Sequence, residues 1–201
     1  ILLITRLKDK KDIPLGIQMS RYSNRLYKVC IVGDGGVGKT TILHRFVDGV
    51  FLENTKLTIG TNFFLKTVKL PDENIKVTLQ IWDLSGQERF SIIRPNFYGG
   101  SKGIIYTFDL TRRNSLINLL NWKKEIERVV GSIPCILLGN KLDLITDIGE
   151  RVLSKDECEQ KKREINASIY IETSAKENLR INKAFTIISR QIYKSIKVIP
   201  S

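Results

Sequence analysis

The residues best placed to do chemistry form a glycine-rich stretch from Gly33 to Thr40, which reads Gly-Asp-Gly-Gly-Val-Gly-Lys-Thr. It fits the phosphate-loop pattern G-x-x-x-x-G-K-[ST] at every fixed position. Glycines let backbone N–H groups turn inward around an anion, because no Cβ blocks the turn or the close approach. Lys39 supplies a positive charge for the outer phosphates, and the Thr40 hydroxyl is placed to bind Mg²⁺. We therefore expect a nucleotide-phosphate site here.

The flanking sequence has the order that such a loop requires. An apolar run from Leu26 to Val32 reads as a strand, and apolar residues with helical spacing follow the loop as far as Asp48-Gly49. The N-terminus of a helix carries the positive end of the helix dipole. A helix that begins at the loop therefore strengthens the binding of an anion.

A second motif, Asp83-Leu-Ser-Gly-Gln-Glu88, follows another apolar segment. Asp83 can hold the magnesium shell, and the Gly86 N–H can closely approach a terminal phosphate. Gln87 can orient a water molecule for in-line attack on that phosphate. As a bare string Asp-x-x-Gly is a weak signal, and it gains weight from its place at a strand end downstream of a phosphate loop.

A third motif, Asn140-Lys-Leu-Asp143, follows an apolar segment at residues 134–138. The carboxylate of Asp143 can accept hydrogen bonds from the ring N–H and the exocyclic amine of guanine, a donor pair that adenine lacks. The stem of Lys141 can lie over the base, and Asn140 can tie this loop to the phosphate loop. Taken alone, these residues fit an ordinary charged turn equally well.

A fourth motif, Glu172-Thr-Ser-Ala-Lys176, follows the last expected strand. The Ser174 hydroxyl can brace Asp143, and the backbone N–H of Ala175 can reach the carbonyl oxygen of guanine. The third and fourth motifs together therefore favour guanine as the base.

The elements that must position these motifs follow from the hydrophobic pattern. Strands are expected at residues 26–32, 62–70, 75–82, 103–108, 134–138 and 168–171, and helices at 40–48, 116–130, 155–165 and 181–192. Residues 50–61 and 83–100 are expected to be irregular. Alternating strands and helices indicate an α/β fold with a mostly parallel sheet and helices on both faces, with ligand at the carboxyl ends of the strands.

Length and composition indicate one ordinary domain, with 201 residues, 42% of them hydrophobic and 27% charged. No apolar run reaches the roughly 18 residues of a membrane-spanning helix. Cys30, Cys135 and Cys158 are scattered, which argues against a disulfide framework or a zinc site and favours a reducing compartment. Cys30 and Cys135 lie in apolar runs, so we expect buried, inert thiols. The single histidine, His44, is interpreted as a surface residue rather than a catalytic one.

The formal net charge of +12 raises the question of nucleic-acid binding. The basic residues are spread along the whole chain, without interleaved aromatic residues or the spacing of a recognition helix or zinc finger. A lysine-rich surface is the favoured interpretation, weak attraction to an anionic membrane is the next, and a basic nucleic-acid-binding module is the last. Such a module would bind nucleic acid more weakly as the salt concentration rises, and the number of phosphate contacts would set the slope of log affinity against log salt concentration.

Together, the motifs resemble those of the Ras-superfamily small GTPases, and most of all those of the Rab branch. They are Gly33-Asp-Gly-Gly-Val-Gly-Lys-Thr-Thr41, Thr58-Ile59-Gly60, Ile81-Trp-Asp-Leu-Ser-Gly-Gln-Glu-Arg-Phe90, Asn140-Lys-Leu-Asp143 and Glu172-Thr-Ser-Ala-Lys176. The resemblance covers roughly residues 25–195. It implies a P-loop NTPase small G domain: a six-stranded, mostly parallel sheet with an antiparallel second strand and five helices.

The resemblance also implies a guanine-nucleotide switch that hydrolyses GTP to GDP and phosphate with Mg²⁺, slowly unless an activating partner is present. Gln87, Lys39 and Thr58 would be catalytic, and Thr40, Thr58 and Asp83 would hold the metal. The residues expected to contact GTP or GDP are Gly33, Asp34, Gly35, Gly36, Val37, Gly38, Lys39, Thr40, Thr41, Phe51, Thr58, Gly86, Asn140, Lys141, Asp143, Ser174, Ala175 and Lys176. Phe51 matches the aromatic residue that packs near the guanine.

The expected partners are effector proteins, an exchange factor and a GTPase-activating protein. Phe63, Trp82 and Phe97 match the hydrophobic triad with which Rab proteins meet effectors, although Rab proteins usually have Tyr at the position of Phe97. We expect a cytoplasmic monomer that reaches a membrane surface through partners, with at most weak electrostatic contact of its own.

The chain departs from the usual Rab pattern at several positions. Leu84-Ser85 replaces the usual Thr-Ala, Asn62 stands where an acidic residue is usual, and Gly99 stands where Arg is usual. Residues 1–24 are expected to be an extension, disordered or non-native before Met19, and 196–201 a short tail. No cysteine lies in that tail, so prenylation is not expected on the chain as given, a pattern that would suit a Rab-like protein of archaeal or early-branching origin.

Two guanine-nucleotide functions fit these features. One is a switch that hydrolyses GTP, and the other is a scaffold that binds GTP without hydrolysing it because the water-positioning residue is lost. Gln87 is present, and Gly35-Gly36 leave room beside the terminal phosphate. The sequence therefore favours hydrolysis.

Overall fold

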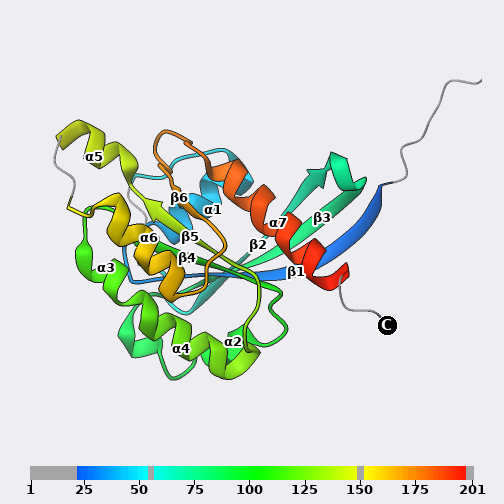
Figure 1. Cartoon of the computed structure of the whole chain (residues 1–201), viewed down its shortest axis with the longest axis horizontal. Coiled ribbons are helices and arrows are strands. Elements are labelled where there is room, and N and C mark those ends of the chain that lie inside the picture. Colours follow the sequence, from blue (N-terminus) through cyan, green and yellow to red (C-terminus); the bar gives the residue numbers. More distant parts are fainter. Residues whose placement is uncertain (1–21, 54–56, 149–151, 198–201) are drawn as a thin grey trace, which may run out of the picture.

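A central β-sheet with helices on both faces organises the chain (Figure 1). The computed structural model describes residues 22–53, 57–148 and 152–197. The expectations for residues 1–21, including Met19, and for the last residues of the tail lie outside the described residues.

The sheet contains six strands among the described residues, in the order β2-β3-β1-β4-β5-β6. Their bounds are β1 Ser23–Val32, β2 Thr61–Leu70, β3 Ile75–Leu84, β4 Gly103–Asp109, β5 Cys135–Asn140 and β6 Tyr170–Glu172. Strand β2 pairs antiparallel with β3, and every other pairing is parallel. The expected sheet, including its antiparallel second strand, is confirmed.

The expectation of five helices is wrong, because the described residues contain seven α-helical segments. They are α1 Lys39–Asp48, α2 Pro95–Tyr98, α3 Arg113–Ile117, α4 Leu119–Val130, α5 Leu142–Ile148, α6 Lys155–Glu164 and α7 Ile181–Lys197, with short 3₁₀ turns at η1 Pro71–Glu73 and η2 Glu88–Phe90. A turn at Asn118 divides α3 from α4, and α5 is an additional short helix directly after β5. Helix α2 and turn η2 lie in the segment 83–100 that was expected to be irregular.

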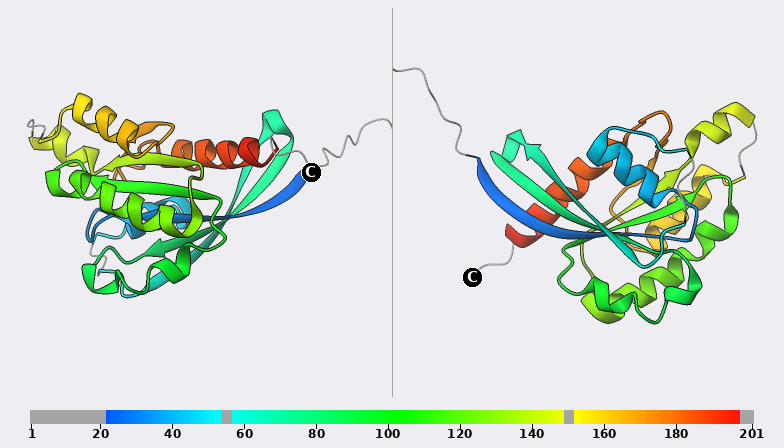
Figure 2. Two further views of the ribbon diagram at one scale, coloured as in Figure 1. Left: turned by 60° about the horizontal axis from the view of Figure 1, so that its bottom comes forward. Right: turned by 180° about the vertical axis from the view of Figure 1, so that it is seen from behind.

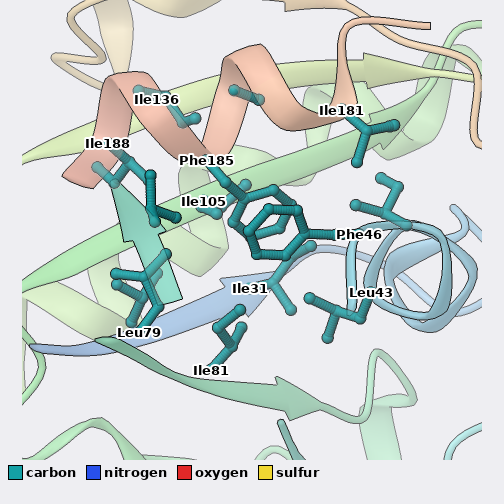
Figure 3. Close-up of a cluster of buried hydrophobic side chains, with 14 of the residues drawn as sticks. Ile31, Leu43, Phe46, Leu79, Ile81, Ile105, Ile136, Ile181, Phe185 and Ile188 are labelled. Atoms are coloured by element: carbon teal, nitrogen blue, oxygen red, sulfur yellow. The ribbon is translucent and has the colours of Figure 1, made fainter. Parts of the chain in front are cut away.

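The alternation of side chains along the strands divides the interior into two cores, one on each face of the sheet. On β1, Val29 and Ile31 face the core that α1 and α7 cover, whereas Cys30 and Val32 face the core that α2, α3, α4 and α6 cover. Figure 2 shows α7 and α4 on opposite sides of the sheet. In the first core, the rings of Phe46 and Phe185 stack with their centroids 3.8 Å apart (Figure 3).

The start of β1 and the end of α7 extend beyond the expected bounds, because the additional residues lack an apolar pattern. Strand β1 begins at Ser23 rather than Leu26, and its first residues are exposed but pair with β3 from Ile75 onward. Helix α7 continues to Lys197 with exposed residues in its last turn. Backbone hydrogen bonds extend both elements beyond the residues that pack on the core.

The cysteines are buried as free thiols, as expected for Cys30 and Cys135. Burial raises the pKa of both thiols to about 11, so the reactive thiolate is scarce near neutral pH. Within the described ranges, no helix has the length and apolar character needed to cross a membrane.

Candidate nucleotide site

A cleft of about 410 Å³ lies at the carboxyl ends of the strands, where the sequence motifs meet. The phosphate loop and α1 form its floor, and the loops after β3, β5 and β6 form its walls. Its lining residues are Gly35, Gly36, Gly38, Lys39, Thr40, Thr41, Phe51, Leu52, Glu53, Leu57, Thr58, Ser85, Gly86, Gln87, Asn140, Lys141, Asp143, Leu144, Ala175 and Lys176.

The phosphate loop wraps around the ammonium group of Lys39. Gly36 and Gly38 have positive φ angles of 76° and 95°, a conformation that glycine adopts without strain. Lys39 Nζ donates to the carbonyl oxygens of Gly33 at 2.7 Å and Asp34 at 2.9 Å. Burial lowers the pKa of Lys39 to about 8, partly offset by the charges of Asp83 and Asp34. A bound anion would favour the charged ammonium, so the loop suits a phosphate.

Three oxygen-bearing side chains from three segments meet beside the loop. Thr40 Oγ1 lies 2.5 Å from Asp83 Oδ2 and 2.9 Å from Thr58 Oγ1. Asp83 is fully buried, and its Oδ1 atom has no hydrogen-bond partner in the described structure. Burial raises the pKa of Asp83, and the hydrogen bond from Thr40 lowers it in part.

This donor set fits Mg²⁺. The ion takes oxygen ligands, and it is commonly held by one or two carboxylates together with waters and substrate phosphates. Among the described residues, no group of three or more His, Cys, Asp or Glu side chains could hold a metal. The unpartnered Asp83 oxygen and the two threonine hydroxyls are therefore suited to Mg²⁺ rather than to zinc.

The two loops that flank the phosphate loop are joined to each other. Ser85 Oγ and Gln87 Nε2 both donate to the carbonyl oxygen of Thr58, at 2.8 Å and 3.1 Å. The Gly35 N–H donates to the Gly86 carbonyl at 3.2 Å. A Cβ on Gly86 would lie 2.3 Å from Asp34 C and from Gly35 N, so only glycine fits this approach.

The opposite end of the cleft is built from the third and fourth motifs. Asn140 Nδ2 donates to the Val37 carbonyl at 3.0 Å, which ties the two loops together as expected. Ser174 Oγ donates to Asp143 Oδ1 at 2.6 Å, which is the expected brace. The Ala175 N–H donates to Asn140 Oδ1 at 3.3 Å. Lys141 Nζ forms an ion pair with Asp109 Oδ2 at 2.7 Å, which fixes the ammonium end of this lining side chain.

A family model described as the Ras family matches residues 28–194. The chain belongs to the Ras family. It is 39% identical over 178 residues to the Ras-related protein Rab-1 of Theileria parva, covering 88% of this chain and 78% of that protein. It is 41% identical over 174 residues to Rab-10 of Diplobatis ommata (86% and 84% covered), and 38% identical over 170 residues to Rab-12 of Mus musculus (84% and 68% covered).

The protein is thus a Rab-like GTPase of the Ras superfamily, a GTP-binding switch that hydrolyses GTP and uses Mg²⁺. Members of this family act with effectors, exchange factors and GTPase-activating proteins, and these are the partner classes of this chain. The expectations of family, fold, activity and cofactors are confirmed.

Most of the residues predicted to contact the nucleotide line the cleft of this GTPase. The exceptions are Gly33, Asp34, Val37 and Ser174, and the predicted metal ligand Asp83 is not part of the lining either. The lining residues that sequence reasoning did not assign to the site are Leu52, Glu53, Leu57, Ser85 and Leu144. Ser85 was noted only as a departure from the Rab pattern.

Three further residues of the GTPase contact the phosphate loop and were not predicted. Arg112 Nη2 donates to the Gly35 carbonyl at 2.8 Å. Asn118 Nδ2 and Trp122 Nε1 donate to the two oxygens of Asp34, at 2.9 Å and 3.0 Å. These residues are far from the loop in the sequence and belong to no local motif, so the sequence carries no spacing signal for them.

Proposed function

We propose that this GTPase hydrolyses GTP in the cleft with Gln87, Lys39 and Thr58 acting at the reacting phosphate. The observation that carries this proposal is the approach of Thr58 and Gln87, from separate loops, to each other and to the phosphate loop. Gln87 Nε2 lies 3.1 Å from the Thr58 carbonyl, and Thr58 Oγ1 lies 2.9 Å from Thr40 Oγ1. Gln87 is therefore held next to the phosphate loop, which supports hydrolysis rather than binding alone.

The residues divide the work as follows. Lys39 places a positive charge inside the loop, where negative charge gathers on the outer phosphates. Gln87 carries a donor and an acceptor on one side chain, so it can hold a water molecule in line with the terminal phosphate. Thr40, Thr58 and Asp83 would hold Mg²⁺, which when bound neutralises charge on the phosphate oxygens.

Replacement of Gln87 by Leu tests this proposal against the scaffold alternative. Gln87→Leu keeps a side chain of similar size but has no polar atom, so GTP affinity should stay near that of the parent while turnover stimulated by an activating partner is lost. Such partners can raise the rate by roughly 10³–10⁵. The measurement is single-turnover hydrolysis of preloaded GTP with and without an activating partner, together with GTP affinity.

A matched Gln→Leu control is available on α6, where Gln160 is exposed and donates a hydrogen bond to Glu164 of its own helix. Gln160→Leu should hydrolyse GTP at the parental rate. If Gln87→Leu did the same, Gln87 would not be the water-positioning residue. If the parent itself failed to turn over GTP, the scaffold would be the better reading.

We further propose that Asp143, Lys141, Asn140 and Ala175 select guanine. Asp143 is nearly fully buried and held by Ser174, so its carboxylate is oriented before the base arrives. Preorganisation of this kind reduces the conformational cost of binding. Phe51 lines the same end of the cleft, where the Arg45 guanidinium lies 5.8 Å from its ring centroid.

We also propose that effectors contact the surface around Phe63, Trp82 and Phe97. These rings form a continuous row, with centroids 6.0 Å apart between Phe63 and Trp82 and 5.9 Å apart between Trp82 and Phe97. Phe63 is half exposed. The row lies beside the loops that contain Thr58 and Gln87, so a change at the terminal phosphate can reach it.

A further inference from the structure

Arg94 is a buried arginine to which no sequence motif assigned a role. It lies just before α2, and only 5% of its surface is exposed. Arginine is almost never buried unless its charge is paired and its donors are satisfied. The groups that pair with the charge and the donors of Arg94 therefore indicate its role.

One side of the guanidinium is fixed by α4. Nε and Nη2 donate to the two oxygens of Glu125, at 3.0 Å and 2.8 Å, in a bidentate pair. Tyr98, which is fully buried, donates its hydroxyl to the same carboxylate at 2.6 Å. The guanidinium carbon also lies 4.0 Å from the ring centroid of Trp122, in cation–π geometry. A planar fork held in this way has one orientation.

The other side of the guanidinium holds the backbone around Gly86. Arg94 Nη1 donates to the carbonyl oxygens of Ser85 at 3.4 Å and Gln87 at 3.2 Å. These carbonyls lie on either side of Gly86, whose own carbonyl accepts the Gly35 N–H. Arg94 therefore fixes the backbone on both sides of Gly86. It holds in place both the Gly86 N–H and the Cα atom that carries the Gln87 side chain.

The same helix also fixes the phosphate loop. Trp122, whose ring lies against Arg94, donates its Nε1–H to Asp34 of that loop at 3.0 Å, and Asn118 donates to the other oxygen of Asp34. Asn118 directly precedes α4, and its spacing to Trp122 and Glu125 places all three residues on one side of the helix. One face of the helix thus sets the phosphate loop and the Gln87 segment at a fixed separation.

We propose that Arg94 is a positioning residue for GTP hydrolysis. Held by Glu125 and Trp122, it keeps Gly86 and Gln87 aimed at the phosphate loop, and it contacts neither GTP nor the attacking water. This inference rests on the proposed roles of Gly86 and Gln87. Because misplacement by a fraction of an ångström weakens catalysis more than binding, loss of Arg94 should lower the hydrolysis rate much more than it lowers nucleotide affinity.

The test is single-turnover hydrolysis of preloaded GTP, with the affinities for GDP and a GTP analogue and the melting temperature measured in parallel. Arg94→Lys keeps the charge, but an ammonium group cannot bridge the Glu125 carboxylate and two carbonyls in one plane. We expect the rate constant to fall at least about tenfold while GDP affinity stays within about threefold of the parent.

The matched control is Arg190→Lys. Arg190 also binds two carboxylate groups, at 2.8 Å to Glu73 and 3.0 Å to Asp72, but it joins α7 to η1 and lines no part of the cleft. It should hydrolyse GTP at the parental rate. A folded Arg94→Lys variant with the parental rate would overturn the proposal. So would equal losses in rate and in GDP affinity, since these would indicate a purely structural role.

Two further variants keep the test decisive. In the Gln87→Leu background, Arg94→Lys should cause no additional loss, because the residue it positions is already gone. If Gln87→Leu alone hydrolyses GTP normally, it is the proposed function that fails. Should Arg94→Lys not fold, Tyr98→Phe removes only the hydroxyl that holds Glu125. A rate loss of about threefold or more with unchanged GDP affinity supports the proposal, and an unchanged rate contradicts it.

Discussion

At the scale of single residues, the base end of the cleft depends on one carboxylate. Asp143 is buried to 6% exposure, and its Oδ1 accepts the Ser174 hydroxyl at 2.6 Å. Burial of a carboxylate costs free energy unless its oxygens accept hydrogen bonds. The N–H donors of a guanine base would supply further hydrogen bonds to Asp143. The choice of base should therefore follow the pattern of donors and acceptors at this one position.

Replacement of Asp143 by Asn should change the preferred base. The substitution exchanges one acceptor oxygen for a donor, which suits a base with a carbonyl where guanine has its amine. We expect GTP affinity to fall by at least about tenfold, since an unpaired buried donor costs about 1–3 kcal/mol. Xanthosine triphosphate should bind more tightly to the variant than to the parent.

A competition titration with both nucleotides measures the two effects together. Asp156→Asn, on the first turn of α6, is the control, and it should leave both affinities unchanged. Unchanged GTP affinity in Asp143→Asn would contradict the assignment of Asp143 to the base.

The residues that could be predicted from the sequence are those whose role depends on a fixed local spacing. The phosphate-loop glycines, Lys39 and Asp143 belong to short motifs, and the backbone geometry of each motif requires those residue types. Arg94 and Trp122 could not be found in this way. They act through contacts between distant segments, and their types would fit an exposed loop and an amphipathic helix equally well.

At the scale of elements, α6 shows how a mostly polar helix is fixed at its start. Ser154 Oγ accepts the Glu157 N–H at 3.2 Å, and Glu157 Oε2 accepts the Ser154 N–H at 2.9 Å, which is a capping box. Glu157 also pairs with Arg113 at the start of α3. The helix buries only Cys158 among its own residues, so its ends matter for its placement.

The stabilisation from Glu157 should depend on pH. The hydrogen bond from Arg113, followed by that from the Ser154 N–H, lowers the pKa of Glu157 to about 2. An unfolded Glu has a pKa of about 4.3, so the contribution is complete above that pH and is lost as the pH falls toward the folded value. Thermal melts of the parent and of Glu157→Gln should therefore differ most near neutral pH and converge as the pH falls toward about 2.

Arg113→Met is the partner control for this measurement. It removes the hydrogen bond that does most to lower the pKa of Glu157, so its melting temperature relative to the parent should follow the same pH trend. A difference between the parent and Glu157→Gln that stays constant down to pH 3 would show that the carboxylate does not stabilise the fold.

Elements with a long apolar stripe were predictable, and short or exposed ones were not. Helix α7 begins at Ile181, where its apolar stripe placed it, and the strands of the central sheet follow their apolar runs. The helices α2 and α5 are too short to show a clear period, and the exposed start of β1 pairs with β3 through its backbone. Tertiary contacts, rather than local pattern, decide these segments.

At the scale of the whole molecule, the two loops that sense the nucleotide behave as one hydrogen-bonded unit. The Thr58 carbonyl accepts bonds from both Ser85 Oγ and Gln87 Nε2, and the Ser85 N–H donates to the Gly60 carbonyl at 3.0 Å. In such switches, contacts to the terminal phosphate and its Mg²⁺ order the loops, and hydrolysis releases them. Because the loops share these bonds, loss of the phosphate should release both together.

Ser85 adds a bond that the alanine usual in Rab proteins cannot make. Its hydroxyl reaches the Thr58 carbonyl at 2.8 Å, and its residue is fully buried. A net hydrogen bond of this kind contributes about 1 kcal/mol, enough to shift a two-state equilibrium several-fold toward the joined state. The chain should therefore hold its two loops together more firmly than a protein with alanine at this position.

Hydrogen–deuterium exchange on the Ser85→Ala variant tests this coupling. Bound to a GTP analogue, the parent should protect residues 57–61 and 85–94 together, and the variant should lose part of the protection of both segments while its GDP-bound state exchanges as the parent does. Ser189→Ala is the control, since Ser189 is also fully buried but donates within α7 to Phe185 at 2.7 Å. It should leave exchange in both loops unchanged. Full protection of residues 57–61 in the Ser85→Ala variant would show that Gln87 and the Gly60 carbonyl suffice to join the loops, and that the serine hydroxyl adds nothing to the switch.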